Sequence, residues 1–199
     1  DYDMDNDVRK RFAELAALPD EQIDLDEAAL LIAAETEDNL SVKHYLKLLD
    51  NLAAKFENKF QATKGHGISV NALIDFIHVE EGFSGNVKDY YEPGNSYLNR
   101  VIDLRHGIPI SLALIHISLG ARLGLSVKGI NFPGHFLIRY GTDKHLIVDP
   151  FTGRTLSKPD CSNMLKQIAG PKAVLQDDYF DVASNKSILI RMLDNLKQI

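Results

Sequence analysis

The sequence predicts an α+β fold in which helices come first and a small antiparallel sheet follows. Three observations lead to this prediction. Apolar residues recur every three or four positions through the first third of the chain, which is the period of a helix with one buried face. Residues 109–123 are almost wholly apolar, as in a helix at the centre of a domain. Three short runs between residues 126 and 148 have the length and turn spacing of strands.

The first third of the chain is predicted to form four helices. Pro19 ends the first, and Asp24 with Glu27 has the spacing of a capping box at the start of the second. Ser69 is suited to cap the fourth. The four helices are expected at residues 7–18, 24–34, 41–63 and 69–79.

The middle of the chain holds a loop and then two helices. Residues 82–95 contain three glycines and a proline, which is typical of a loop. A helix is expected from Asn95 to Arg105, with Asn95 as its cap. Pro109 suits the first turn of the central helix, and Gly124 is well placed to end it.

The last part of the chain is predicted to form the sheet and two further helices. Turns containing Gly134 and Gly141 separate the strand-like runs, so we expect consecutive strands to pair antiparallel. The strands are expected at residues 126–131, 135–140 and 145–148, and the helices at residues 160–169 and 184–199.

The composition narrows the class of protein. The net charge is -6 and there is no block of Lys and Arg, which argues against a nucleic-acid partner. Cys161 is the single cysteine, so no internal disulfide is possible and a cytoplasmic location is expected. No apolar run reaches the roughly 18 residues of a membrane span.

Four polar residues are candidates for a site: Ser111 at the start of the central helix, His135 on a strand, Asp149 at the end of the next strand, and Arg105. An antiparallel hairpin would place His135 beside Asp149, where a carboxylate can orient an imidazole base. Each residue also has a structural interpretation. Ser111 can bond back along its own helix, and His135 can be a hydrogen-bonded core histidine. Asp149 can open a turn, and Arg105 can form a surface ion pair.

Metal and cofactor sites are not expected. The histidines have no ligand spacing with one another or with Cys161. The glycine-containing segments at residues 65–67 and 82–85 do not match a phosphate-binding loop.

The stretch NSYLNRVIDLRHGIPISLALIHISLGARLGLSVKGINFPGHFLIRY, followed by LIVDPFTG, resembles the SirB-type transglutaminase-like family. The resemblance covers about residues 70–155. It implies a papain/transglutaminase-like core at residues 69–158, with a helical part at 1–68 packed on it. Helices at 159–199 would then lead into tetratricopeptide-like repeats, and the three parts would form one compact unit.

The resemblance also implies a Cys, His and Asp site, in which His135 and Asp149 occupy the matching strand positions. The slot of the cysteine falls on Pro109 or, with a shift of two residues, on Ser111, and neither is a thiol. We therefore expect a catalytically degenerate domain that acts as a protein-interaction or regulatory module. The alternative is a hydrolase or acyltransferase that uses Ser111, His135 and Asp149.

The binding residues expected around this site are Asn95, Tyr97, Arg105 and Asn131. Arg105 and the helix start could hold an anionic small molecule or a peptide carboxylate. The expected partner is another protein, without a cofactor, a nucleic acid or a membrane.

Overall fold

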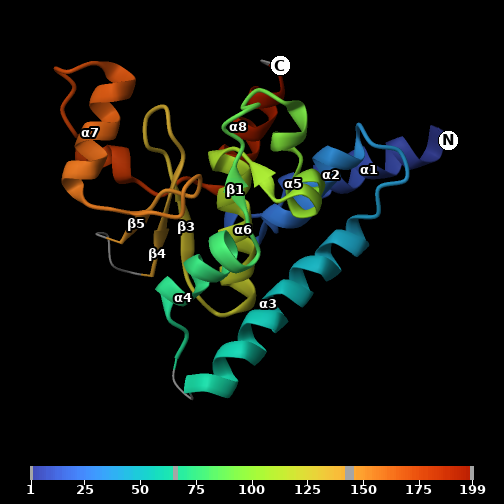
Figure 1. Ribbon diagram of the computed structural model, residues 1–199. Coiled ribbons are helices and arrows are strands. Elements are labelled where there is room, and N and C mark those ends of the chain that lie inside the picture. Colours follow the sequence, from blue (N-terminus) through green and yellow to red (C-terminus); the bar gives the residue numbers. More distant parts are fainter. Residues whose placement is uncertain (1, 65–66, 142–145, 198–199) are drawn as a thin grey trace.

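Residues 2–64, 67–141 and 146–197 are described by the structure, a computed structural model in which a central helix separates a helical half from a small sheet (Figure 1). Helix α1 (Tyr2–Ala16) leads through a short 3₁₀ turn to α2 (Leu25–Ala34), and α3 (Val42–Lys64) is the longest helix described. The predicted capping box of α2 is wrong, because Asp24 makes no capping hydrogen bond. The neighbouring Asp26 carboxylate accepts from the Glu27 amide instead, at 2.7 Å.

The middle of the chain is more irregular than its sequence predicts. Ser69 caps α4 (Val70–Asp75) as expected, and a π-helical turn at Phe76–Glu80 continues it. Two strands of two residues each, β1 (Ser84–Gly85) and β2 (His106–Gly107), then pair in parallel across the loop. Helix α5 (Leu98–Leu104) begins three residues later than predicted, after a 3₁₀ turn at Pro93–Ser96.

Helix α6 (Pro109–Arg122) is the predicted central helix, and nearly all of its residues are buried. Pro109 is its first residue. Proline lacks a backbone N–H, and at this position an N–H would have no acceptor within the helix. Gly124, in the left-handed conformation (φ +73°), follows its end. The helix contacts α2, α3 and α5 on one side and strands β3 and β4 on the other.

The main sheet is four-stranded and antiparallel, in the order β3 (Val127–Ile130), β4 (Leu137–Tyr140), β5 (Ile147–Val148) and β6 (Thr155–Leu156). The sequential antiparallel pairing of the three predicted strands is confirmed, and β6 extends it. His145, which begins the third predicted strand, lies outside the described residues.

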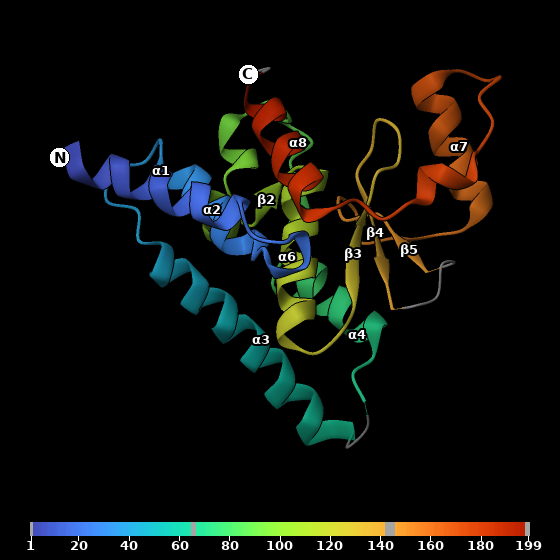
Figure 2. The same cartoon turned by 180° about the vertical axis from the view of Figure 1, so that it is seen from behind.

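The two faces of the sheet pack on different helices (Figure 2). Ile138, Tyr140 and Val148 join the main core with α6. Leu137 and Ile147 alternate with them and join a second core cluster that includes residues of α7 (Lys158–Ala169). This alternation follows from the two-residue period of a strand.

The last helix, α8 (Asn185–Lys197), returns to the main core. Its residues Ile188, Leu189 and Met192 are buried there. In the part of the chain that the structure describes, no helix is both long enough and apolar enough to cross a membrane.

Candidate functional site

The structure brings His135 and Asp149 together, as the predicted hairpin requires. His135 Nε2 lies 2.8 Å from Asp149 Oδ1. His135 precedes β4 and Asp149 directly follows β5, and the two strands pair Ile138 with Val148. Gly134, at φ +71°, makes the turn that presents His135, a conformation that a side chain at this position would strain.

Asp149 is held as a carboxylate at the bottom of this site, where it is 5 % exposed. Burial by itself would raise its pKa, but hydrogen bonding and charge interaction with His135 outweigh burial and lower it. The Phe151 amide, at 2.9 Å, and the Thr152 hydroxyl, at 3.2 Å, also donate to the carboxylate. The ionised Asp149 accepts a hydrogen bond from the N–H at His135 Nε2. This hydrogen bond fixes the orientation of the imidazole ring.

The other ring nitrogen of His135, Nδ1, makes no hydrogen bond to any residue that the structure describes, and the side chain is 22 % exposed. His135 lines a cleft of about 270 Å³ beside the start of α6. Residues from the loop before α5, from the start of α6 and the residue before it, from the turn before β4 and from α8 form its walls. These are Tyr90, Tyr91, Ser96, Ile108, Pro109, Ile110, Gly134, Phe136, Arg191 and Asn195.

Ser111 is not part of this cleft. Its side chain is fully buried, and its hydroxyl donates to the Asn95 carbonyl at 2.6 Å. The same oxygen accepts from the Ile108 amide at 3.1 Å, which satisfies an N–H at the helix start. The hydroxyl therefore braces the first turn of α6, and within the described chain it has no hydrogen bond to His135. The wall of the cleft is formed instead by Pro109, two residues earlier.

The predicted binding residue Arg105 supports a loop. Its guanidinium lies 3.4 Å from the Glu81 carboxylate and 4.5 Å above the Phe83 ring. It also donates to the Glu81 and Ile102 carbonyls. The residue ends α5 in the left-handed conformation, at φ +63°, so its side chain leaves the helix toward Glu81. Arg105 therefore does not line the cleft of His135 but a separate pocket of about 480 Å³, and anion binding by Arg105 stays a prediction.

The other three predicted binding residues have separate roles. Asn95 does not cap α5; its amide donates to the Asp89 and Tyr90 carbonyls, at 2.7 and 3.0 Å, and so fixes the loop that carries Tyr90. Tyr97 lines a different pocket, between α1, α2 and α8. Asn131 is exposed, and its side-chain oxygen lies 3.5 Å from Arg191 Nη1.

Sequence reasoning missed Ser96 and Arg191 as residues of the cleft. Ser96 is buried, and the described residues offer its hydroxyl no hydrogen bond. Arg191 comes from the last helix, more than fifty residues after His135. The sequence held one indication of this role. Arg191 lies next to the apolar stripe of α8, and a long cationic side chain beside a buried stripe is itself half-buried.

A buried hydrogen-bond chain runs behind the site. His78 Nε2 lies 2.8 Å from His116 Nε2, and His116 Nδ1 bonds the Tyr140 hydroxyl. The Phe83 carbonyl can only accept a hydrogen bond, so His78 Nδ1 carries the proton and donates to it. His78 Nε2 must then accept, so His116 Nε2 donates to it. His116 Nδ1 in turn accepts from the Tyr140 hydroxyl. Burial lowers the pKa of both histidines, and that of His116 falls well below its usual value. Every hydrogen bond from Tyr140 to the Phe83 carbonyl can thus form with both histidines neutral.

Cys161, the single thiol, does not line the cleft beside His135. It is buried on α7 in the second core cluster. Burial, followed by the charge of Asp160, raises its pKa to about 11, which disfavours the reactive thiolate. Among the described residues, no group of three or more His, Cys, Asp and Glu side chains could hold a metal ion.

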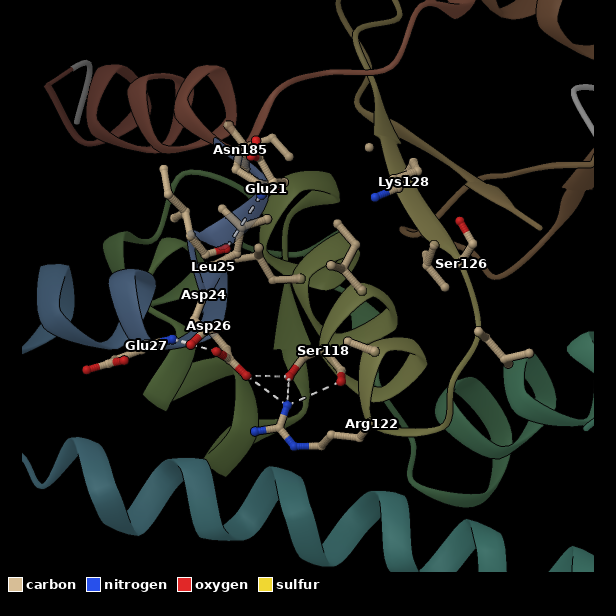
Figure 3. A pocket seen from close by; sticks show the side chains of 18 of the residues that line it. Glu21, Asp24, Leu25, Asp26, Glu27, Ser118, Arg122, Ser126, Lys128 and Asn185 are labelled. Carbon is tan, nitrogen blue, oxygen red and sulfur yellow. Dashed lines mark hydrogen bonds and ion pairs between the residues drawn. The ribbon is translucent and has the colours of Figure 1, made fainter. Parts of the chain in front are cut away.

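A larger cavity of about 550 Å³ lies at the other end of α6, where an arginine of α6 is paired with carboxylates from neighbouring helices (Figure 3). Arg122 reaches Asp26 and Asp50, each at 2.7 Å. Ser118 donates to the same Asp26 carboxylate at 2.9 Å. These contacts tie α6 to α2 and α3, so the polar groups here serve the fold.

Comparison with known proteins identifies the family that has this arrangement. The model of the transglutaminase-like superfamily matches residues 43–194. The chain belongs to this superfamily. Its central helix and small antiparallel sheet are thus those of a transglutaminase-like domain.

Several relatives share most of the transglutaminase-like chain. A UPF0162 protein of Pseudomonas aeruginosa is 38% identical over 95% of this chain and 69% of its own length. Another, from Xylella fastidiosa, is 34% identical over 93% of this chain and 68% of its own length. F-box only protein 21 of Homo sapiens is 33% identical over 64% of this chain and 21% of its own length. No solved structure matches.

Proposed function

We propose that this transglutaminase-like domain has no acyl-transfer activity and acts as a binding module, through which the protein interacts with or regulates a partner. The observation that carries the proposal is Pro109 beside His135 on the wall of the cleft. Pro109 offers neither a nucleophilic side chain nor a backbone N–H for an oxyanion. The nearby Ser111 hydroxyl is engaged in bracing the helix.

The resemblance to SirB-type proteins adds a finer element to this proposal. Tetratricopeptide-like repeats would follow the domain in the whole protein, and helical repeats of this kind present extended binding surfaces. The His135–Asp149 pair would then shape a polar pocket and hold β4 and β5 in register, rather than activate a nucleophile.

The test is turnover of amide and ester substrates by the intact chain, with His135→Ala as the matched variant. The expected result is no release of product above the uncatalysed rate, and no difference between the two proteins. Release that disappears in His135→Ala would overturn the proposal.

A serine-dependent hydrolase is the second candidate, and one observation favours it. The Ser96 hydroxyl lines the same cleft as His135 and has no hydrogen bond within the described residues. Turnover lost in both Ser96→Ala and His135→Ala, but kept in Ser111→Ala, would establish Ser96 as the nucleophile.

Restoring a thiol tests whether Pro109 marks the vacant place of the nucleophile. In Pro109→Cys the new thiol would stand at the start of α6 next to His135, where an imidazole and a helix start favour thiolate. We expect iodoacetamide to alkylate this thiol faster than it alkylates Cys161, and more slowly once His135→Ala is added. Equal rates with and without His135 would contradict this placement.

A further inference from the structure

Arg191 places a positive charge at the cleft that no carboxylate of the described residues pairs with. It is half-buried, with its guanidinium carbon 5.3 Å from the centre of the Phe136 ring. Asn131 Oδ1, at 3.5 Å, is its hydrogen-bond partner. Within the part of the chain that the structure describes, Arg191 forms no ion pair. Burial lowers its pKa, but an arginine remains charged at neutral pH.

Five of the other seven arginines form ion pairs with carboxylates: Arg9, Arg11, Arg100, Arg105 and Arg122. Arg139 and Arg154 form none with the described residues, and neither lines this cleft. A charge withdrawn from water without a counter-charge costs free energy. Arg191 carries that cost at the wall of a cleft, where an incoming anion could offset it.

The rest of the cleft fits the same kind of ligand. The Ser96 hydroxyl can donate or accept a hydrogen bond there, the free Nδ1 of His135 can accept one, and among the described residues no Asp or Glu lines the cleft. Ile108, Pro109 and Phe136 give the remaining walls an apolar character. At about 270 Å³ the space is just below the roughly 300 Å³ at which small-molecule sites begin. It therefore suits a small anionic group with an apolar part attached.

We propose that the cleft binds a carboxylate that carries an apolar or aromatic group. Arg191 pairs with the carboxylate, since its planar fork matches two carboxylate oxygens, and the Ser96 hydroxyl donates a hydrogen bond to it. The apolar group lies against Pro109 and Phe136. The inference rests on the proposed function, because it assigns the cleft to a ligand that is held and not turned over. Either a free small acid or the C-terminal residue of a peptide has this chemistry.

The experiment is a calorimetric titration of the intact chain with N-acetyl-phenylalanine and, as the matched control, N-acetyl-phenylalaninamide, which has nearly the same shape without the charge. We expect the acid to bind at least about tenfold more tightly than the amide, as for a charge-assisted contact. Equal affinities would overturn the inference. This comparison uses the unmodified protein, so it does not depend on how any variant folds.

Variants then assign the charge. Arg191→Met should weaken binding of the acid by about tenfold or more and leave the amide unchanged, while Arg191→Lys should retain part of the preference. Arg9→Met removes the same charge from α1, where the side chain is 74% exposed, and should have no effect. Binding of the acid that is equal in wild type and Arg191→Met would overturn the assignment. So would inorganic phosphate that binds more tightly than the acid.

Two further arms distinguish the source of the ligand and separate this inference from the proposed function. A free-acid peptide ending in Phe that binds more tightly than N-acetyl-phenylalanine, and an amidated peptide that does not, would support a chain terminus as the ligand. The reverse order would support a small acid. Ester turnover that needs His135 would overturn the proposed function even where the preference for acid over amide holds. Loss of that preference overturns the inference alone.

Discussion

The two ends of α6 use polar residues in opposite ways. At its C-terminal end, Arg122 meets Asp26 and Asp50, and Ser118 adds a hydrogen bond to the same network. At its N-terminal end, the His135–Asp149 pair and Arg191 lie at the cleft, and Arg191 forms no ion pair with the described residues. The arginine at the first end, the balanced end, is thus paired with carboxylates of the protein, and the arginine at the second, the unbalanced end, is not.

This difference teaches how to separate a structural polar cluster from a binding site in a protein without a bound ligand. The cavity at the balanced end is the larger of these two, and a third, of about 940 Å³ beside β5, β6 and α7, is larger than both, so size alone does not select the cleft at His135. Groups that have already exchanged water for protein partners have little left to offer a ligand. The useful signal is a donor or a charge whose partner is missing from the fold.

The largest effect is expected from pH, through the buried histidines between the two ends. Their folded pKa values lie below the ordinary 6.5, so the unfolded chain binds more protons once the pH falls below that value. The free energy of unfolding should then fall with pH, by up to about 1.4 kcal/mol per pH unit for each histidine. Asp149, whose pKa is lowered from 3.8, adds a further loss only below about that pH.

Urea unfolding between pH 5 and 8 measures this effect. His116→Leu should flatten the pH dependence, whereas His44→Gln, at an exposed position, should preserve it. A free energy of unfolding that stays constant from pH 8 to pH 5 would show that His78 and His116 are not kept neutral in the folded protein.

Arg122→Met tests the balanced end. It leaves Asp26, which lies near the carboxylates of Asp24 and Glu27, without its cation, and the ion pair is mostly shielded, with side chains 21% and 15% exposed. We expect a loss of about 2 kcal/mol, below the range for fully buried pairs. Denaturant unfolding checks this, and a loss under about 0.5 kcal/mol, as for exposed pairs, would remove the contrast between the two ends.

Ser111→Ala tests the structural role of a residue that first resembled a nucleophile. The change leaves the buried Ile108 amide and Asn95 carbonyl without their partner, so we expect a loss of about 1–2 kcal/mol. Ser126→Ala, on the exposed turn after α6, should stay within about 0.5 kcal/mol of wild type. Unfolding curves of the two variants that coincide would speak against the bracing role.

The smallest change in stability is expected at the unbalanced end. Arg191→Met keeps an apolar stem against Phe136 and removes a half-buried charge that has no ion pair. The free energy of unfolding should change by less than about 0.5 kcal/mol, in contrast to Arg122→Met. A loss above about 1 kcal/mol would mean that Arg191 supports the fold as Arg122 does.

The sequence was sufficient for the features that depend on local periodicity. The buried character of α6, the antiparallel order of the strands and the meeting of His135 with Asp149 all follow from residue spacing. The strands β1 and β2 have two residues each, which is too short for an alternating pattern of apolar and polar residues to be recognised in the sequence.

The identity of the cleft's cation could not be predicted in this way. Arg105 and Arg191 have the same chemistry, and what separates them is that Glu81 stands near the first and no carboxylate pairs with the second in the described structure. Likewise, Ser111 is engaged by a carbonyl sixteen residues earlier. Such partners are set by how distant segments approach, which residue spacing does not encode.

The start of α8 has a consequence for the whole cleft. Asp20, near the other end of the chain, accepts from the backbone amides of Asn185 and Lys186 at 3.0 and 2.9 Å, which fixes the rotation of the helix about its axis. Successive helical residues point about 100° apart. One residue inserted between Lys186 and Arg191 would therefore turn Ile190 toward the cleft in place of the guanidinium. A loop contact at Asp20 thus selects which side chain α8 presents to His135.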